Sequence, residues 1–338
     1  MNLSASILSR FKTARLIAWL SAISYAICCF ANTPEYTTKF KEQADSFLSR
    51  LPDGMQHIQT KAIRKAMAGD CRALDSIRMA RNAEPSLPQG VRRTKVGDNL
   101  FLFRSERFKN DTLPLLIYLH GGGWTIGSVN SCTAYCAQMA ANGVAVLAVD
   151  YRLAPENPFP AGLNDCISAV KTARENLTAW KCNSIALGGD SAGGNLSIAT
   201  ALSCDPGLID RLILFYPVTA AYADLSESWE TYGSGYALDS ELMTAFNEAY
   251  TDDIFNPLVS PAHASDEILA SLPPTLLVAA DHDILKSQGR RFAERIRNLG
   301  VDVSYHLIPG SVHLFITVAG QPAAFSKAVE LSLAFIRN

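Results

Sequence analysis

The sequence predicts an α/β fold in which a mostly parallel central sheet is covered by helices on both faces. From residue 113 onward, short apolar runs rich in β-branched residues alternate with amphipathic segments, which is the pattern of parallel strands joined by crossover helices. The 338 residues are 48% hydrophobic and only 18% charged, so the chain can bury a sizeable core. The same composition excludes disordered, collagen-like and coiled-coil classes of protein.

The expected elements follow one another in chain order. Residues 91–103 are expected to form antiparallel edge strands, because they precede the first crossover. Apolar runs too short for helices predict the core strands at residues 115–119, 144–149, 185–187, 212–216, 276–279 and 303–308. Amphipathic patterns, several closed by Gly or Asn as expected of C-caps, predict helices at 132–142, 162–177, 192–203, 287–299 and 323–336.

Two segments do not fit this alternation and are expected to form a helical cap. Residues 32–87 contain charged helical patterns without a strand, and about residues 222–254 form a long aromatic-rich insertion between two strands. Insertions longer than ~15 residues in a compact fold are usually functional. We therefore expect N-terminal cap helices at 32–87 and a catalytic domain at 88–338 that carries a second cap segment.

The N-terminus has the features of a targeting segment. Three basic residues and no acidic residue precede an apolar run at 16–31, whose sixteen residues fall short of the ~20 that a spanning helix needs. We interpret residues 1–31 as a signal peptide, which predicts export to the periplasm or outside the cell. The alternative is an uncleaved membrane anchor through residues 16–31, and only in that case do we expect membrane contact.

Charge and cysteine usage exclude two kinds of partner. The chain has 30 basic and 32 acidic residues, and residues 32–338 alone carry a net charge of −5, which argues against nucleic acid as a partner. The six cysteines after residue 31 show no CxxC spacing and no nearby histidine cluster, so we expect no metal site. Export would allow one or two disulfides, although Cys132 and Cys136, at helical spacing, are expected to pack as apolar residues.

The sharpest motif is Gly-Asp-Ser-Ala-Gly at residues 189–193. It lies directly after the predicted strand 185–187 and directly before a predicted helix, which is the context of the G-x-S-x-G nucleophile elbow. The two glycines permit a tight strand-to-helix turn that raises the Ser191 hydroxyl above the sheet. The helix N-terminus behind it favours developing negative charge. We therefore predict Ser191 as the nucleophile of an acyl-transfer reaction.

A second motif, His120-Gly121-Gly122-Gly123-Trp124, follows the strand 115–119 without a gap. Consecutive glycines allow backbone N–H groups to point into a cavity, whereas a simple turn needs only one or two permissive residues. Two of these donors, with the N–H of Ala192, would surround a carbonyl oxygen as it becomes an oxyanion. Each such donor contributes about 2.7–4 kcal/mol to transition-state stabilisation.

A nucleophilic serine needs a base and a carboxylate. His313 lies just beyond the strand 303–308, and loops at the carboxyl ends of strands are where open α/β sheets place their site residues. For the carboxylate, Asp281 and Asp283 both follow the strand 276–279. Their positions in the sequence barely distinguish which of the two orients the histidine, and counting from the strand end slightly favours Asp281.

These motifs together resemble the hormone-sensitive-lipase branch of the α/β-hydrolases, which includes the bacterial family IV esterases. The resemblance covers about residues 88–338 and depends on HGGGW at 120–124, DYRLAPENPFPAGLND at 150–165, GGDSAGGN at 188–195, DHDIL at 281–285 and PGSVHLF at 309–315. It implies the α/β-hydrolase fold and the acid Asp283, which stands two residues before the Leu of a D-x-L segment. It also implies an oxyanion hole made by the N–H groups of Gly122, Gly123 and Ala192.

The resemblance implies a serine carboxylesterase that hydrolyses short-chain, acetyl-type esters of small molecules without a cofactor. Two alternatives stay open: an amidase or peptidase using the same chemistry, and a non-enzymatic receptor-like module. The receptor known on this fold lacks the imidazole at the position of His313, which this chain keeps. For substrate contacts we expect the insertion aromatics Trp229, Tyr232 and Tyr236, and Leu314, which replaces the family's usual Gly after the histidine.

Overall fold

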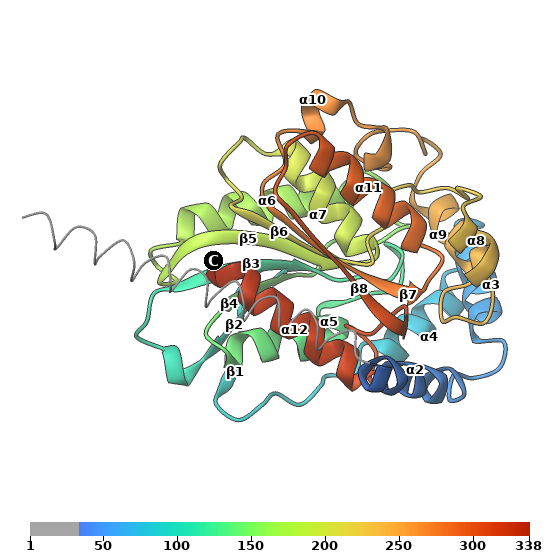
Figure 1. Ribbon diagram of the computed structural model, residues 1–338, viewed down its shortest axis with the longest axis horizontal. Coiled ribbons are helices and arrows are strands. Elements are labelled where there is room, and N and C mark those ends of the chain that lie inside the picture. The colour runs from blue at the N-terminus through green and yellow to red at the C-terminus, as the bar shows by residue number, and fades with distance from the viewer. Residues whose placement is uncertain (1–33) are drawn as a thin grey trace, which may run out of the picture.

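A computed structural model gives the fold of residues 34–338, with the side chains described from residue 37 onward. The predicted signal peptide or anchor at residues 1–31 lies outside the described residues. Figure 1 shows one curved sheet with helices on both of its faces and a group of further helices at one end. Between residues 34 and 338, no helix is both long enough and apolar enough to cross a bilayer.

The sheet has eight strands in the order β1-β2-β4-β3-β5-β6-β7-β8. The pairs β1·β2 and β2·β4 are antiparallel, and all pairs from β4 to β8 are parallel. The strand bounds are β1 Val91–Gly97, β2 Leu100–Ser105, β3 Leu113–Leu119, β4 Ala145–Val149, β5 Cys182–Asp190, β6 Arg211–Phe215, β7 Thr275–His282 and β8 Val303–Val312. The predicted α/β class, with its antiparallel edge, is confirmed.

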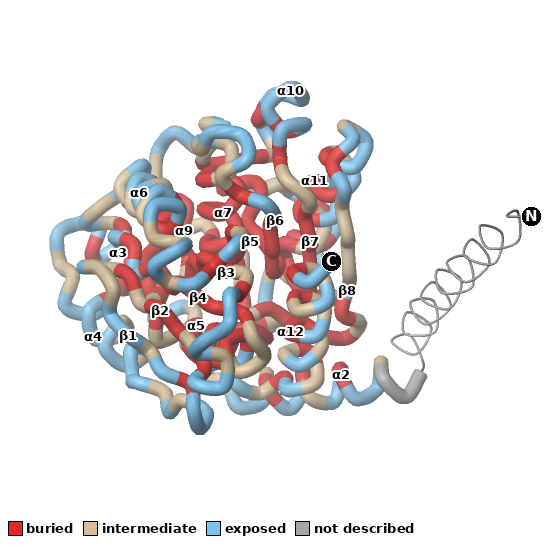
Figure 2. The backbone as a smooth tube through the Cα atoms, turned by 90° about the vertical axis from the view of Figure 1, so that its left-hand side faces the viewer, coloured by how far each residue is buried: buried red, intermediate tan, exposed pale blue. Residues whose placement is uncertain are grey.

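Side chains that alternate along the central strands define the two helical layers. In β3, Leu115 and Ile117 belong to one apolar cluster, whereas Leu116 and Tyr118 belong to the cluster on the opposite face. The first face is covered by α6 (Ala161–Asn176), α7 (Ala192–Ser203) and α11 (Lys286–Asn298), and the second by α5 (Val129–Ala141) and α12 (Pro322–Arg337). Figure 2 shows the central strands buried between these layers, whereas the edge strands β1 and β8 are partly exposed.

Two elements extend beyond the bounds predicted from sequence, for identifiable reasons. Helix α5 begins at Val129 rather than at 132, because Ser128 and Ser131 form a capping box at its start. Strand β5 continues to Asp190, past the predicted end at 187, through two glycines that an apolar-run criterion does not recognise. A Cβ at Gly188 would lie 2.6 Å from the carbonyl oxygen of Ile213 on β6, so close strand packing requires glycine there.

Helices from two distant parts of the chain lie together at one end of the sheet (Figure 1). They are α2 (Pro34–Leu48), α3 (Met55–Met67) and α4 (Arg72–Arg81) from the N-terminal segment, and α8 (Glu227–Tyr232) and α9 (Ser240–Tyr250) from the insertion. Arg64 of α3 forms ion pairs with Glu241 and Glu248 of α9, at 3.4 and 3.3 Å. These exposed pairs add little energy, but they fix how the two segments meet.

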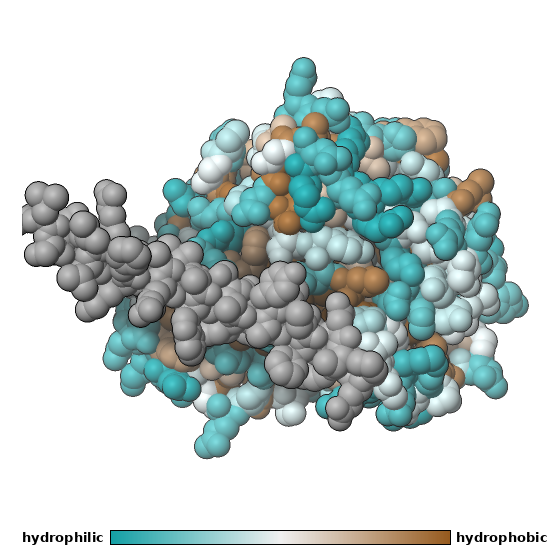
Figure 3. Space-filling view, viewed as in Figure 1, coloured by the Kyte–Doolittle hydropathy of each residue, from teal (hydrophilic) through white to brown (hydrophobic). Residues whose placement is uncertain are grey.

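The described surface is mainly polar. Figure 3 shows one face on which hydrophilic side chains predominate and apolar ones occur in small groups. A short helix, α10 (Asp266–Leu269), projects from the body and was not predicted. The large apolar side chains that are exposed are distributed over several elements, with two of them on α3: Ile58, Met67, Met79, Leu225, Phe255, Ile268 and Leu307.

Candidate active site

Ser191 lies at the sharp turn between β5 and α7. Its backbone has φ 55° and ψ −119°, a conformation that L-residues rarely adopt and that costs on the order of 1–3 kcal/mol. Hydrogen bonds hold the turn: Ser191 N donates to Phe215 O at 2.9 Å, and Ser191 O accepts from Val218 N at 3.2 Å. The turn is tight because a Cβ at Gly193 would lie 2.0 Å from Leu119 O. The local fold thus raises the hydroxyl toward the carboxyl end of the sheet.

Ser191, His313 and Asp283, which are far apart in the sequence, form one hydrogen-bonded chain. His313 Nε2 lies 3.1 Å from Ser191 Oγ, and His313 Nδ1 lies 2.6 Å from Asp283 Oδ2. All three residues are buried. Because an ionised carboxylate can only accept, Nδ1 carries the hydrogen, which leaves Nε2 free to accept the serine proton. This is the geometry required of a nucleophile, a base and the group that orients the base.

The structure shows which of the two candidate carboxylates, Asp281 or Asp283, contacts His313. Asp283 lies just past the end of β7, where Oδ1 accepts from Leu285 N at 2.9 Å and Oδ2 faces His313. Asp281 lies within β7, accepts from Gly310 N at 3.0 Å and pairs with Lys286 at 3.2 Å. Asp281 therefore holds the turn near the end of β8, whereas Asp283 contacts the imidazole.

His313 is fixed by packing as well as by Asp283. Gln321 Nε2 donates to the His313 carbonyl at 3.1 Å, and the ring of Tyr216 packs against the imidazole with centroids 4.3 Å apart. The remaining histidines have other partners. His57 lies by Glu241, His263 hydrogen-bonds to Tyr222, His282 packs against Tyr232 and Tyr236, and His306 contacts Ser304.

Backbone donors of the glycine loop border the Ser191 hydroxyl. Gly122 and Gly123 line the same cavity as Ser191, and their N–H groups donate no hydrogen bond to any residue in 34–338. The N–H of Ala192, the first residue of α7, has no partner within its own helix. A Cβ at Gly123 would lie 2.1 Å from the ring of Phe246, so only glycine fits there. The arrangement is suited to hold a developing oxyanion.

The glycine loop that carries these donors is held by hydrogen bonds and by an aromatic stack. The buried His120 donates from Nδ1 to Gly121 O at 2.9 Å, and its own carbonyl accepts from the Tyr151 hydroxyl at 2.6 Å. Burial lowers the pKa of His120, so the imidazole stays neutral in this structural role. Trp124 stacks on Tyr250 of α9 with ring centroids 4.3 Å apart. The loop and the cap are therefore joined by an aromatic contact.

The buried carboxylate of Asp190, the last residue of β5, also hydrogen-bonds to the glycine loop. Asp190 Oδ1 accepts from Tyr118 Oη and from Gly121 N, both at 3.0 Å. Burial raises the pKa of Asp190 to about 6, and these two hydrogen bonds partly offset that effect. Asp190 thereby links the nucleophile turn to the glycine loop.

The cavity in front of Ser191 has a volume of about 200 Å³. His313 and the glycine loop form its floor, and Leu314 borders it, as expected from the sequence. Leu314 has φ 72°, which places its side chain beside the base in a strained backbone position. Cap residues provide most of the remaining wall: Met55, Gln59, Arg81, Ala237, Leu238, Leu242 and Phe246.

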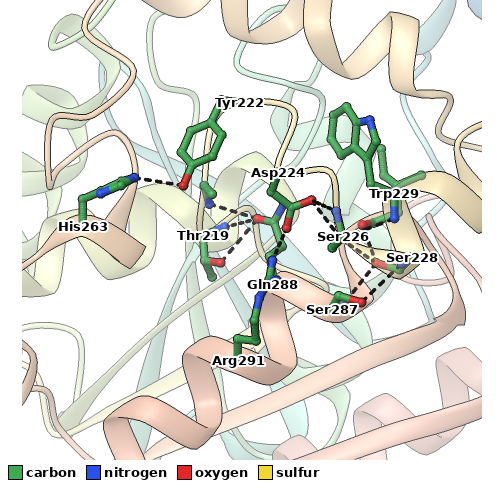
Figure 4. A network of polar contacts seen from close by, with 12 residues as sticks. Thr219, Tyr222, Asp224, Ser226, Ser228, Trp229, His263, Ser287, Gln288 and Arg291 are labelled. Carbon is green, nitrogen blue, oxygen red and sulfur yellow. Dashed lines mark hydrogen bonds and ion pairs between the residues drawn. The ribbon is translucent and has the colours of Figure 1, made fainter.

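Trp229, Tyr232 and Tyr236, for which we expect substrate contacts from the sequence, do not line this cavity. Trp229 is buried in the main apolar cluster, and Tyr232 and Tyr236 pack against each other and against His282. Helix α8 is held at the start of α11 by Ser228, which accepts from Ser287 N at 3.0 Å (Figure 4). The Ser228 hydroxyl also donates to Ile284 O at 2.8 Å.

The same network fixes the start of the insertion. Asp224 Oδ1 accepts from the Ser226 hydroxyl at 2.8 Å, and the Asp224 carboxylate pairs with Arg291 of α11. Gln288 Oε1 accepts from Thr219 N at 2.7 Å. The helical residues of the insertion that line the cavity come instead from α9, where Leu242 and Phe246 occupy i and i+4 on one helix face. Apolar residues at that spacing usually mark an ordinary core-facing helix, so the sequence pattern did not single them out.

Metal-binding and disulfide chemistry can be compared with the described residues. Within residues 34–338, no group of three or more His, Cys, Asp and Glu side chains is arranged to bind a metal. The six cysteines of that range are free thiols, and Cys132 and Cys136 are buried in α5 as expected from their spacing.

Comparison with known proteins places the chain in a family. A family model described as alpha/beta hydrolase fold matches residues 116–317. Carboxylesterase NlhH of Mycobacterium tuberculosis is 35% identical over 240 residues, which cover 68% of this chain and 74% of that protein. An arylesterase of Saccharolobus solfataricus is 36% identical over 233 residues, which cover 66% of this chain and 74% of that protein.

Solved structures of esterases have a similar fold. Carboxyl esterase 2 (TmelEST2) of the mycorrhizal fungus Tuber melanosporum superposes with a TM-score of 0.68 at 26% identity, over 75% of this chain and 88% of that one. The chain belongs to the α/β-hydrolase fold family, and the resemblance to its hormone-sensitive-lipase-like branch is confirmed.

Proposed function

We propose that this protein is a serine carboxylesterase that hydrolyses short-chain acyl esters through an acyl-enzyme on Ser191. That it is a carboxylesterase follows from its fold together with its esterase relatives. The observation that carries the serine mechanism is the chain of hydrogen bonds from Ser191 Oγ through His313 to Asp283, at 3.1 and 2.6 Å.

In the acylation step, Ser191 Oγ attacks the ester carbonyl while His313 Nε2 takes the hydroxyl proton. The carbonyl oxygen becomes an oxyanion and accepts hydrogen bonds from the N–H groups of Gly122, Gly123 and Ala192. Asp283 stabilises the imidazolium that forms. The tetrahedral intermediate then collapses, the bond to the alcohol oxygen breaks, and His313 gives its proton to the departing alcohol.

In the deacylation step, water replaces the alcohol. His313 takes a proton from the water, the resulting hydroxide attacks the acyl carbonyl, and the same donors hold the second oxyanion. Collapse returns the proton to Ser191 Oγ and releases the carboxylic acid. Every step uses groups that the chain itself supplies.

The size of the cavity supports a short acyl chain. Its volume of about 200 Å³ is below the roughly 300–1,000 Å³ typical of sites for drug-sized ligands. Apolar side chains narrow the cavity: those of Leu238, Leu242 and Phe246 from the cap, and that of Leu314 beside the base. A long acyl chain would have to displace these buried side chains.

We therefore expect kcat/KM on a series of p-nitrophenyl esters to be highest for acyl chains of about two to six carbons and to fall for longer chains. Leu242→Ala widens the cavity and should move the optimum to longer chains. The control is Leu225→Ala in the same insertion, because Leu225 is 74% exposed and does not line the cavity.

Steady-state rates on the series, measured for the three proteins side by side, check this prediction. An optimum at ten or more carbons in the unaltered protein would contradict the short-chain proposal without affecting the serine mechanism. A matched p-nitroanilide tests the amidase alternative, for which amide turnover should approach that of the ester.

A further inference from the structure

The cavity contains one cation that the proposed mechanism does not use. Arg81, the last residue of α4, lines the cavity together with Ser191 and His313. Its guanidinium donates no hydrogen bond and forms no ion pair with any other residue that the structure describes. A half-buried guanidinium normally has a carboxylate partner, because removing it from water is costly.

The neighbours of Arg81 are held by hydrogen bonds, which fixes the place of its backbone at the end of α4. Arg78, one helical turn earlier, donates to Thr125 O at 2.8 Å and to Ala154 O at 2.9 Å. It also pairs with Glu156, an interaction that lowers the pKa of that carboxyl to about 2. On the other side, Asn82 accepts from Asn130 at the start of α5. The last turn of α4 is thus held against the oxyanion loop and α5.

The charged side chain that acts on the pKa of Arg81 is that of Asp190. Burial lowers the pKa of Arg81, and the charge of Asp190 partly opposes that effect. No hydrogen bond joins Arg81 to Asp190: Oδ1 of Asp190 accepts from Tyr118 and Gly121, and Oδ2 has no partner among the described residues. Arg81 is thus a cation without a hydrogen-bonded partner among the described residues, and it lines a cavity that a ligand can occupy.

Polar side chains that line the same cavity complete a site for an oxyacid. Gln59 of α3 carries an amide there, and Ser131 lies in the first turn of α5, where the helix N-terminus favours negative charge. A planar guanidinium matches a carboxylate through two parallel hydrogen bonds. In a cavity of about 200 Å³, a small carboxylate is the anion that fits beside an ester group.

We propose that Arg81 binds a carboxylate carried by the substrate, so that the preferred esters are short and anionic. This inference depends on the proposed function, since it names the substrate class of the same site. The carboxylate could belong to the acyl part, as in a monoester of a short dicarboxylic acid, or to the alcohol part, as in an acylated hydroxy acid. Both present the same chemistry to Arg81, and the experiment distinguishes them.

The test compares esters that differ in charge but hardly in shape. For the acyl side, p-nitrophenyl hemiglutarate is paired with p-nitrophenyl 5-methylhexanoate, in which an isopropyl group replaces the carboxylate. For the alcohol side, 4-acetoxybenzoate is paired with 4-isopropylphenyl acetate. The quantity measured is the ratio of kcat/KM for the charged ester to that for its neutral partner.

We expect this ratio to favour the charged ester in at least one pair. Arg81→Met should lower it by about 10- to 100-fold, the usual effect of losing a charge-assisted pair, and Arg81→Lys should lower it less. Arg72→Met is the matched control. It removes the same charge from the same helix, but Arg72 is exposed and pairs with Asp70 outside the cavity, so the ratio should not change.

A ratio that Arg81→Met leaves unchanged, or that Arg72→Met lowers equally, would overturn the proposal. So would a wild-type preference for the neutral ester in both pairs. Failure of the underlying function would look different, because hydrolysis of the neutral esters would then not depend on Ser191. Binding of glutarate to Ser191→Ala protein, measured by calorimetry, gives a second readout, and the Arg81→Met change should weaken it by a similar factor.

Discussion

Replacing Ser191 by alanine is expected to lower kcat on a short-chain ester by on the order of 10⁶. The substitution removes the atom that would form the acyl-enzyme, while the turn itself is held by backbone hydrogen bonds to Phe215 and Val218 that alanine keeps. Ser191→Ala protein should therefore fold and bind substrate, and only the chemistry should fail. Initial rates on p-nitrophenyl acetate, after removal of host esterases, measure the effect.

The matched control is Ser203→Ala, at the far end of the same helix. The Ser203 hydroxyl only donates to Ala199 O within α7, so its loss should change the rate less than about twofold. If Ser191→Ala lost less than tenfold in activity, Ser191 would not be the nucleophile.

The second large effect is expected for Asp283→Asn, which should lower kcat by about 10⁴. An amide cannot stabilise the imidazolium as a carboxylate does, and its N–H₂ group can force His313 into the tautomer that cannot accept the serine proton. The Asn oxygen can still accept from Leu285 N, as Asp283 Oδ1 does at 2.9 Å, so the fold should survive. Thermal melting beside the kinetics separates the two effects.

Asp281→Asn is the matched comparison for this prediction. Asp281 accepts from Gly310 N and pairs with Lys286, and neither contact reaches the imidazole. We expect a kcat within about tenfold of the unaltered protein, because a partly exposed ion pair contributes little. A larger loss at Asp281 than at Asp283 would reverse the assignment.

The sequence predicted the parts of the site that local chain geometry determines. A glycine-flanked serine between a strand and a helix, and a glycine run directly after a strand, specify where Ser191 and Gly121–Gly123 lie relative to the sheet. His313 followed from its place after the last strand. Residue types and short spacings suffice for these positions, because each belongs to a turn that few backbones can form.

The choice between Asp281 and Asp283 could not be made from spacing alone. In a continuing strand, residues two apart point to the same side of the sheet. Strand β7 ends at His282, and the chain then turns toward α11, so the two side chains diverge. The difference depends on the residue at which the strand ends, and strand ends are the least certain feature of a sequence pattern.

The residues that form the cavity wall were the part of the site that the sequence predicted least well. Aromatic residues of the insertion suggested a substrate pocket, but Trp229 is buried by packing of α8 on the catalytic domain. The wall comes from Leu242 and Phe246 on α9 and from Arg81 on α4. A basic residue in the last turn of a helix has an ordinary explanation in the helix dipole, so only the fold shows that Arg81 lines the same cavity as Ser191.

The most direct measurement is to trap the nucleophile with an activated phosphonate ester and locate the label by peptide mass spectrometry. Attack by Ser191 predicts one label per chain, on the peptide that contains residues 189–193, with loss of esterase activity in proportion to labelling. Excess short-chain ester should slow the labelling. A label on another residue, or complete labelling with esterase activity retained, would contradict the assignment of Ser191 as the nucleophile.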